Sequence, residues 1–371
     1  MSQPTILHVI DTTGPGGAET VFIELADRLR QEGFRSIPVI RGAGWVADRL
    51  RGRGMEPVII PAKGSFNLRY LAALIRLIRK ERVTLVQAHL LGSSVYCALA
   101  GLLTRTPVVA TFHGMVDLSA RERFVWLKRA ALRFGVSRFV AVSRSLAEAL
   151  ADGGILDANR YTVIFNGIDT GRYNVPRTGW IHEQLGLPAD AKISISLGNV
   201  RPAKAYDVLC RAAAALKDSH PELHFVIAGD PKKAIVEDLQ RLCRELGVTD
   251  HVHFIGFQND TPRVLAEADV FVLSSSSEGF SIATIEALAA GTPAVLTACG
   301  GPEEIAVPGQ HALMVGVGDA EGLATAIRRV LESSDLAAQL ECAGRALVRG
   351  KFDLDAMTRA YEAIYRSAQN P

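Results

Sequence analysis

The chain has 371 residues, of which 48% are hydrophobic and 6% aromatic, and its formal net charge is +2. These values are typical of a globular α/β protein with room for two domains, and they exclude a disordered or fibrous chain. The five cysteines are widely spread and form no C-x-x-C pair, so neither a zinc knuckle nor a disulfide framework is indicated. No stretch reaches the roughly 18 apolar residues of a membrane span, and no basic leader precedes the first apolar run, so we expect a cytoplasmic protein.

The charge is divided unevenly along the chain. Residues 1–174 contain 23 Lys and Arg against 14 Asp and Glu, a net of +9, whereas residues 175–371 contain 18 against 25, a net of −7. A basic first half predicts an anionic partner, such as a membrane surface or a phosphate-bearing substrate. We therefore expect peripheral contact with the inner face of the cytoplasmic membrane as one option, and no binding of nucleic acid.

The first half alternates short apolar runs with longer amphipathic segments, which is typical of a parallel, doubly wound α/β sheet. We expect strands near residues 6–10, 36–40, 57–60, 85–88, 108–111, 138–142 and 161–165, with helices near 19–30, 45–52 and 68–82 and another after Ser143. The loop before the first helix contains Gly14, Gly16 and Gly17, which allow close approach of a ligand to the backbone. A dinucleotide fingerprint starting at Gly14 requires a third glycine where Glu19 stands, so an NAD site is disfavoured and a tight turn without ligand remains the alternative.

Two histidines follow strands of this predicted sheet. His89 and His113 stand at carboxyl ends of strands, the edge at which doubly wound sheets bind ligands. A structural role is favoured for His89 and remains open for His113. Residues 121–133 combine apolar side chains with five basic ones, so they form either an amphipathic helix on an anionic membrane or an ordinary packed surface helix.

The second half repeats the alternation after an irregular segment. Residues 171–191 suit a linker between domains, and strands are expected near 193–197, 224–227, 252–255, 270–273 and 294–297. The loop after the first of these strands carries Arg201 and Lys204, two cations placed to clamp a diphosphate. Gly256 and Phe257 follow another strand of the series.

The most specific stretch is residues 270–293. An apolar strand leads through four serines to Ser281, a predicted N-cap, and then to an apolar helix that ends at Gly291. Glu278 precedes this helix and Glu286 lies inside it. Because an ionised Glu in an apolar helix needs partners, Glu286 either receives ribose hydroxyls or is paired internally with a buried Arg or backbone donors.

The segment that enters this helix offers an anion site. The backbone N–H groups of Gly279, Phe280 and Ser281 are expected to point away from the helix N-terminus, where a phosphate is favoured. Sugar hydroxyls are the expected partners of Glu278.

In its ordered motifs the chain resembles the GT-B glycosyltransferases of the large retaining family 4, over essentially its whole length. The strongest motif is E-x7-E, from Glu278 to Glu286, followed by GGPEEI. The other motifs, in order, are GGAE at residues 16–19, TFHG around His113, NGID at 166–169 and RPAK at 201–204. The resemblance implies two Rossmann-like domains facing across a cleft: an acceptor-binding domain of residues 1–174, with a C-terminal helix of about 356–371 packed back on it, and a donor-binding domain of residues 175–355.

The resemblance also implies roles for individual residues. Lys204 and Arg201 would hold the diphosphate, Glu286 the ribose, and Glu278 the donor sugar. The remaining donor-binding residues would be Gly16, Gly17, Gly256, Phe257, Gly279, Phe280 and Ser281, and the catalytic residues would be His113, Glu278, Arg201 and Lys204. No metal ligand is implied.

Two positions depart from the family pattern. Many relatives have Arg where Asn199 stands, and Arg201 is expected to supply that charge. Ala205 replaces the usual glycine after the loop lysine, so the backbone there should be more restricted.

The implied reaction is retaining transfer of a sugar from a nucleotide-sugar to a lipid-linked or saccharide acceptor in glycan or polysaccharide biosynthesis. A UDP-sugar is preferred and a GDP-sugar comes next; neither metal nor cofactor is expected, since the nucleotide-sugar is a substrate. The alternatives are a GT-B sugar-nucleotide epimerase or hydrolase and a non-catalytic nucleotide-sugar-binding protein, with an NAD oxidoreductase the weakest.

Overall fold

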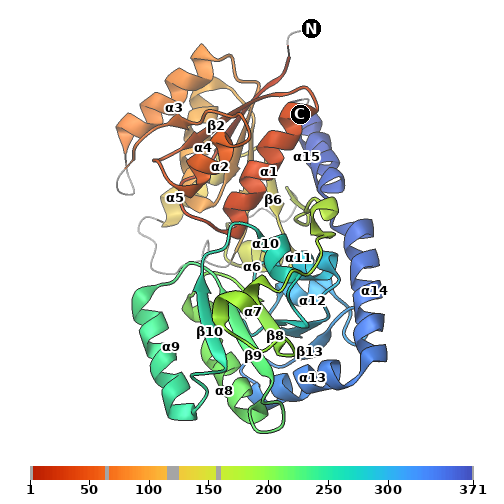
Figure 1. Cartoon of the computed structure of the whole chain (residues 1–371). Helices are drawn as coiled ribbons and strands as arrows, with labels where there is room; N and C mark the ends of the chain where they lie inside the picture. Colours follow the sequence, from red (N-terminus) through yellow and green to blue (C-terminus); the bar gives the residue numbers. More distant parts are fainter. Residues whose placement is uncertain (1–2, 63–66, 115–124, 156–159, 370–371) are drawn as a thin grey trace. The chain divides into compact units, whose positions relative to one another are not determined.

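The chain forms two compact units, one of Met1–Gly167 with Leu354–Pro371 and one of Ile168–Asp353 (Figure 1). The computed structural model describes residues 3–62, 67–114, 125–155 and 160–369. The boundaries fall a few residues before the expected 174 and 355, because the chain enters and leaves the second unit side by side. Ile168 forms a β-bridge with Asp353, and its N–H donates to Phe352 O at 3.0 Å.

The first unit is built on seven parallel strands, β1 (Thr5–Val9), β2 (Arg35–Ile40), β3 (Val58–Ile59), β4 (Leu85–His89), β5 (Val108–Phe112), β6 (Arg138–Ala141) and β7 (Tyr161–Val163). Its described helices are α1 (Gly17–Gln31), α2 (Trp45–Arg51), α3 (Leu68–Lys80), α4 (Leu91–Thr104), α5 (Val125–Gly135), α6 (Arg144–Asp152) and α15 (Leu354–Gln369). The strand order is β3-β2-β1-β4-β5-β6-β7. Every residue of β1, β4 and β5 is buried, as expected for strands covered by helices on both faces.

Helix α15 belongs to the first unit and packs beside α1 (Figure 1). Two buried tyrosines attach it to the sheet: Tyr361 Oη lies 3.2 Å from Thr111 Oγ1, and Tyr365 Oη donates to Gln87 Oε1 at 3.0 Å. Gln87 Nε2 in turn donates to Thr111 Oγ1 at 2.8 Å, so four buried polar side chains satisfy one another. This network fixes α15 against β4 and β5.

The second unit repeats the plan with six parallel strands, β8 (Lys192–Leu197), β9 (Leu223–Ala228), β10 (Val252–Gly256), β11 (Val270–Leu273), β12 (Ala294–Thr297) and β13 (Leu313–Val315), in the order β10-β9-β8-β11-β12-β13. Its α-helices are α7 (Trp180–Leu185), α8 (Tyr206–Leu216), α9 (Lys233–Leu246), α10 (Thr261–Leu265), α11 (Ile282–Ala290), α12 (Gly301–Ile305), α13 (Ala320–Glu332) and α14 (Ser334–Lys351), with 3-10 turns η2 (Thr170–Tyr173) and η3 (Pro202–Lys204). The predicted fold class, two doubly wound α/β sheets, is confirmed.

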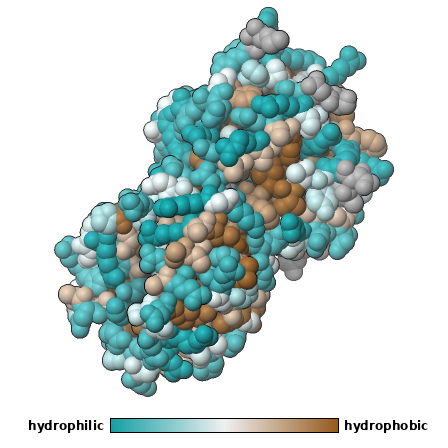
Figure 2. All heavy atoms as spheres, turned by 90° about the vertical axis from the view of Figure 1, so that its right-hand side faces the viewer, coloured by the Kyte–Doolittle hydropathy of each residue, from teal (hydrophilic) through white to brown (hydrophobic). Residues whose placement is uncertain are grey.

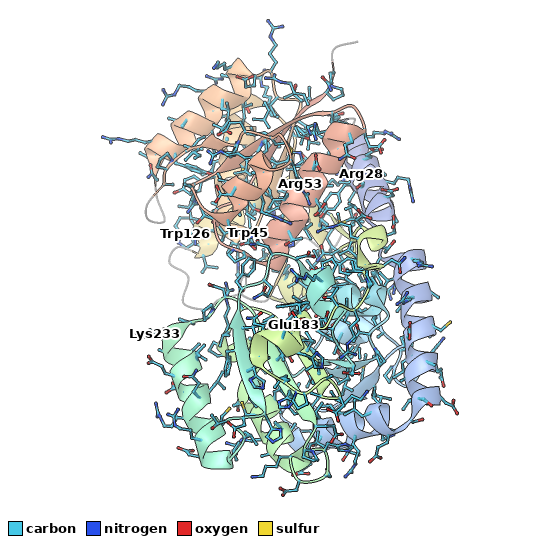
Figure 3. The ribbon with its side chains drawn as sticks, in the orientation of Figure 1. Arg28, Trp45, Arg53, Trp126, Glu183 and Lys233 are labelled. Carbon is cyan, nitrogen blue, oxygen red and sulfur yellow. The ribbon has the colours of Figure 1, made fainter. Side chains whose placement is uncertain are left out.

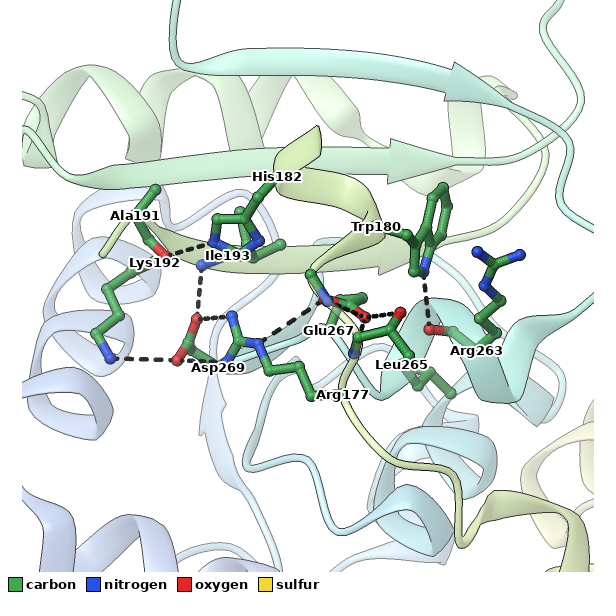
Figure 4. Close-up of polar contacts among 12 residues, drawn as sticks. Arg177, Trp180, His182, Ala191, Lys192, Ile193, Arg263, Leu265, Glu267 and Asp269 are labelled. Carbon is green, nitrogen blue, oxygen red and sulfur yellow. Dashed lines mark hydrogen bonds and ion pairs between the residues drawn. The ribbon is translucent and has the colours of Figure 1, made fainter. Parts of the chain in front are cut away.

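The expectation of an irregular linker at residues 171–191 is wrong. The segment contains η2 and α7, and fully buried Glu267 fastens it to the second unit (Figure 4). Glu267 Oε1 accepts from the N–H and Oγ1 of Thr178 at 2.7 and 3.0 Å, and Oε2 accepts from Gly179 N at 2.9 Å. The scattered Pro and Gly residues that predicted a linker give no sign of a carboxylate almost 90 residues later.

A second carboxylate completes this anchor. Asp269 receives both terminal nitrogens of Arg177, at 3.2 and 3.1 Å, together with the N–H of Ile193 at 2.8 Å (Figure 4). The bidentate pair lowers the pKa of Asp269 although burial opposes it. Glu267 and Asp269 stand just before β11, at the amino-terminal edge of the sheet.

Strand β13, Leu313–Val315, was not predicted. None of the described helices combines the length and apolar composition needed to cross a membrane. Figure 2 shows apolar side chains gathered in patches among hydrophilic ones on the face that it draws, which is ordinary for a globular surface.

Candidate active site

The switch point of the second sheet lies between β8 and β11, where the strand order reverses direction. The two strands pair directly, with Val270 opposite Ser194. In sheets of this kind ligands bind beyond the carboxyl ends of the strands at the switch point. The loop after β8 carries Lys204 and the loop after β11 carries Glu278, so both motif residues stand at that edge.

Lys204 and Glu278 form an ion pair at this point, with Lys204 Nζ 2.7 Å from Glu278 Oε1. The same oxygen accepts a hydrogen bond from Ser275 Oγ at 2.7 Å. The side chains are 21% and 14% exposed, so the pair is largely shielded yet reachable from solvent. A cation held in this way can accept a second anion, because one carboxylate does not use all three ammonium protons.

The two loops are joined along their length. Ser274 Oγ donates to Lys204 O at 2.9 Å, and Ser276 N donates to Ala203 O at 2.8 Å. The serine run, which the sequence indicated only as an exit from the sheet, therefore fixes the lysine loop. Gly198 contributes as well: its φ is +151°, and a Cβ there would lie 2.6 Å from Lys204 Cε.

Ala205 has left-handed backbone angles, φ 45° and ψ 46°. This conformation is easy for glycine and unfavourable for alanine, so the departure from the family pattern falls on a strained position. The strain occurs between Lys204 and the first residue of α8.

Helix α11 begins and ends as predicted. Ser281 is the N-cap and its Oγ accepts from Thr284 N at 3.3 Å, whereas Gly291 closes the helix at φ 79°. Gly279, Phe280 and Ser281 lead from the Glu278 loop into this N-terminus. A Cβ on Gly301 would lie 2.8 Å from Phe280 Cα, so a glycine is required where α12 meets this segment.

Glu286 lies half-buried in α11 with hydroxyl donors around it. Its Oε1 accepts from Tyr173 Oη at 2.7 Å and from Thr261 Oγ1 at 2.9 Å. Burial and the nearby carboxylate raise the pKa of Tyr173 well above its usual value, so the phenol stays protonated as a donor. Neither partner was predictable from a local pattern, because Tyr173 and Thr261 lie 113 and 25 residues from Glu286 in the sequence.

The other predicted donor residues occupy the same edge. Gly256, at φ +71°, ends β10 with a break in register, and Phe257 follows it half-buried. Gly229 N donates to Gly256 O at 2.9 Å, which ties the ends of β9 and β10 together. Arg201 is exposed and precedes η3.

The first unit holds its own cluster at the carboxyl edge. His89 Nδ1 lies 2.9 Å from His113 Nε2, and the two rings are stacked at 5.2 Å. His8, on the neighbouring strand β1, is fully buried, and Phe22 packs edge-on against both His8 and His89. Three adjacent strands thus bring three histidines together, one of which, His8, the sequence analysis missed because its position resembles an ordinary strand interior.

These histidines are uncharged at neutral pH. Burial lowers the pKa of His8 and of His113 to about 3, and the pKa of His89 falls well below its usual range through burial and the two neighbouring rings. Within the described part of the chain, His89 Nε2 and His113 Nδ1 have no hydrogen-bond partner. The pair can therefore offer neutral donors or acceptors to a ligand.

Gly16 and Gly17 stand where α1 begins. Gly16 is the N-cap with extended backbone, Gly17 is the first helical residue, and buried Glu19 lies within the first turn. A Cβ on Gly16 would overlap the Glu19 carboxylate, so glycine is needed there for packing. The structure thus groups Lys204, Glu278 and residues 279–281 in the second unit, and His113 with His89 in the first.

Comparisons with known proteins identify the family. The model described as "Glycosyl transferases group 1" matches residues 180–347, and the model "Glycosyltransferase Family 4" matches residues 15–172. The lipopolysaccharide core biosynthesis glycosyltransferase LpsE of Rhizobium meliloti is 29% identical over 95% of this chain and 96% of its own length. The D-inositol 3-phosphate glycosyltransferase of Streptomyces scabiei is 31% identical over 79% of this chain and 70% of its own.

Solved structures support the fold. Anabaena HepE in complex with UDP-glucose has a TM-score of 0.88 at 23% identity, with 98% of this chain and 99% of that chain covered. WaaG, a glycosyltransferase involved in lipopolysaccharide biosynthesis, has a TM-score of 0.75 at 19% identity, with 97% and 99% covered. The two sheets therefore have the architecture of GT-B glycosyltransferases, and the chain belongs to the group 1 glycosyltransferases of family 4.

Proposed function

We propose that this glycosyltransferase moves a sugar from a UDP-sugar, with a GDP-sugar as the next candidate, to a lipid-linked or saccharide acceptor in glycan or polysaccharide biosynthesis. The observation that carries the proposal is the Lys204–Glu278 pair at 2.7 Å at the switch point of the second sheet, beside the N-terminus of α11. An ammonium and helix amides together favour a bound phosphate. HepE has been solved with UDP-glucose, and relatives act in lipopolysaccharide core biosynthesis.

The proposed roles follow from what each residue contacts. Lys204 and exposed Arg201 hold the diphosphate, and the amides of Gly279, Phe280 and Ser281 assist them. Glu278 receives hydroxyls of the donor sugar. Glu286 already accepts from two hydroxyls, and ribose hydroxyls are donors of the same kind. The ends of β9 and β10, with Gly256 and Phe257, lie next to the base.

The proposed reaction retains the anomeric configuration and uses neither a metal nor a cofactor. The bond from the anomeric carbon to the phosphate oxygen breaks, and the acceptor oxygen bonds to that carbon on the same face. The acceptor proton passes to the departing phosphate oxygen. Lys204, Arg201 and the helix amides stabilise the charge that develops on the phosphate, and His113 acts as a neutral hydrogen-bonding group toward the sugar.

A thermal-shift panel with UDP, GDP, ADP and nucleotide-sugars tests the donor site, since a ligand that binds only the folded state raises its stability. We expect UDP and UDP-sugars to raise the melting temperature of the wild type and not of Lys204→Ala. No shift with any nucleotide would contradict the donor site. Product analysis then separates the alternatives. Donor hydrolysis or epimerisation that no acceptor accelerates would favour an epimerase or hydrolase. Nucleotide-sugar binding without turnover would favour a regulatory protein.

We also propose that the basic first unit contacts an anionic membrane surface, with the protein otherwise in the cytoplasm. Helix α5 exposes Trp126 and Phe134, each 72% accessible, beside the exposed cations Arg129 and Arg133 (Trp126 is labelled in Figure 3). Aromatic side chains next to basic ones are typical of interfacial helices. Residues 121–124 of the predicted amphipathic segment lie outside the described part of the chain.

Vesicle flotation tests this contact. We expect more protein on vesicles with anionic lipid than on neutral ones, and less for the double variant Trp126→Ser with Phe134→Ser. The matched control replaces Val307 and Val317, which are 53% and 48% exposed on the second unit, by Ser. Equal flotation on neutral and anionic vesicles would exclude the contact.

A further inference from the structure

A polar and aromatic cluster lies at the carboxyl ends of β1 and β2 in the first unit, and none of the roles above uses it. Asp11 comes two residues after β1, and Arg41 directly follows β2. Arg41 Nη2 lies 3.6 Å from Asp11 Oδ2, and the guanidinium stands over the rings of Tyr70 and Tyr96 at 5.2 and 5.8 Å.

The two side chains are held in place from several directions. The rings of Tyr70 and Tyr96 pack edge to face with their centroids 5.0 Å apart, and together they orient the Arg41 guanidinium that stands over them. A Cβ on Gly92, in the first turn of α4, would overlap the Asp11 carboxylate, which therefore packs against that helix. The loops that carry the pair are joined as well, because Val46 N donates to Thr13 O at 3.1 Å. The cluster is thus rigid before any ligand arrives.

The hydrogen-bonding capacity of the cluster is only partly used. The 3.6 Å separation of Arg41 and Asp11 is longer than a hydrogen bond, and Arg41 Nε has no partner among the described residues. The side chains of Arg41 and Asp11 are 20% and 17% exposed, so a ligand can reach both. Buried polar groups in folded proteins are normally satisfied, so this arrangement calls for a ligand.

The charges select the class of ligand. Guanidinium and carboxylate together are neutral, so the pair offers a phosphate no net charge. The Lys204–Glu278 pair differs, because exposed Arg201 in the same loop and the amides of residues 279–281 add positive charge there. A vicinal diol fits better, because one hydroxyl donates to Asp11 and its neighbour accepts from Arg41. Sugar rings present such pairs of hydroxyls with fixed spacing.

We propose that Asp11 and Arg41 form a subsite for a vicinal diol of the acceptor saccharide. This subsite rests on the proposed function for its role in transfer, but its binding chemistry is independent of the donor site. The acceptor is then a sugar whose ring hydroxyls bind at the carboxyl ends of β1 and β2. Loss of either side chain weakens acceptor binding and leaves nucleotide binding in the second unit intact.

The test uses saturation-transfer NMR on the full chain, saturated with UDP, with methyl α-D-glucopyranoside, methyl α-D-galactopyranoside and methyl α-D-mannopyranoside as probes. Asp11→Asn and Arg41→Lys should each weaken binding of the responsive glycoside by about tenfold or more. The first removes the charge of the acceptor, and the second replaces the planar donor group that stands over Tyr70 and Tyr96 by an ammonium with a different geometry. The matched control is Glu24→Gln, because Glu24 pairs with Arg53 in the same unit at exposures of 15% and 20% (Arg53 is labelled in Figure 3). Glu24→Gln should bind the glycoside like the wild type.

A cooperative thermal unfolding transition, measured without UDP, shows that each variant is folded, and Arg41→Lys keeps the test open if Asp11→Asn does not fold. Unchanged glycoside binding in Arg41→Lys, or no binding of any probe by the wild type, overturns the subsite. Inorganic phosphate that binds in an Arg41-dependent and Asp11-independent manner overturns the diol assignment in favour of an anion. Asp11-dependent glycoside binding without any UDP response leaves the subsite standing and counts against the proposed function instead.

Discussion

The two sheets share the same order of their first six strands, yet the carboxyl edges of their central strands carry different kinds of chemistry. In the second unit the edge beyond β8 and β11 holds an ion pair, Lys204 with Glu278. In the first unit the edge beyond β4 and β5 holds two stacked, uncharged histidines, with His8 buried behind them. The same backbone plan therefore supports an ion pair beyond β8 and β11 in one sheet and an uncharged histidine pair beyond β4 and β5 in the other.

Burial explains the difference. Lys204 is 21% exposed and lies 2.7 Å from the Glu278 carboxylate, whereas burial lowers the pKa of His8 and of His89 and so disfavours their charged forms. A charged edge suits a diphosphate, which enters with its own charge. A neutral edge suits sugar hydroxyls, which need directional hydrogen bonds and no counter-charge. The predictions below perturb one side of this contrast at a time.

The largest effect is expected from Lys204→Ala. It removes the cation of the second switch point and leaves Glu278 without its ion partner, so we expect kcat/KM for transfer to fall about 10³-fold. Titration calorimetry with UDP should show a matching loss of affinity. Lys192→Ala is the control, since Lys192 begins the same strand β8 and pairs with Asp269 at the other edge. If both variants transfer equally well, the charge at the switch point is not what binds the donor.

Glu267→Gln probes the amino-terminal edge of the same sheet. The carboxylate is fully buried and accepts from Thr178 and Gly179, so its loss should lower the free energy of unfolding by about 2 kcal/mol. Urea unfolding followed by circular dichroism measures this change. UDP affinity should stay near wild type at temperatures where the variant is folded. A loss of UDP affinity with unchanged stability would contradict the division between a structural and a functional edge.

Much of this contrast was predictable from the sequence, because the signals that determine it act between residues close together in the chain. Apolar runs of strand length, Ser281 before an apolar helix and Gly291 after it each act within a few residues, and these predictions are confirmed. The placement of Lys204 and Glu278 at one sheet edge follows from strand alternation. The hydrogen-bond partners of Glu286 could not be predicted from the sequence, because Tyr173 and Thr261 come from distant segments of the chain.

The prediction that residues 171–191 form a linker was wrong for the same reason. The segment has the composition of a linker, and only the fold brings Glu267 and Asp269 against it. The role of His8 was not predicted, because a single histidine in a short strand does not differ from an ordinary interior residue in the sequence pattern. Asp11 and Arg41 were likewise invisible, because their pairing depends on β1 and β2 lying side by side. Roles assigned through the family resemblance remain predictions until the variants are measured.

His8→Leu tests whether the histidine cluster of the first sheet is uncharged. Because the pKa of His8 is about 3 in the folded protein and about 6.5 when unfolded, the unfolded state binds an extra proton below pH 6.5, and stability falls with the pH from there toward 3. Between pH 6.5 and 5.5 this amounts to about 1 kcal/mol for one histidine. Over this pH interval the free energy of unfolding of the variant should therefore fall by about 1 kcal/mol less than that of the wild type. Equal losses, with equal baselines at pH 8, would mean that His8 takes up its proton in the folded state.

The smallest effect is expected from Ala205→Gly, which relieves backbone strain directly after Lys204. A left-handed φ of 45° costs alanine about 1 kcal/mol, and glycine gives back about 0.4–1 kcal/mol through the greater freedom of the unfolded chain. The free energy of unfolding should therefore change by less than about 0.5 kcal/mol. UDP affinity is the more informative readout: if the strain holds Lys204 in position, the relaxed glycine loop should bind UDP more weakly at unchanged stability. Equal affinity would show that the strain at Ala205 is not needed, and that the hydrogen bonds from Ser274 and Ser276 together with the Glu278 ion pair suffice to hold Lys204 in position.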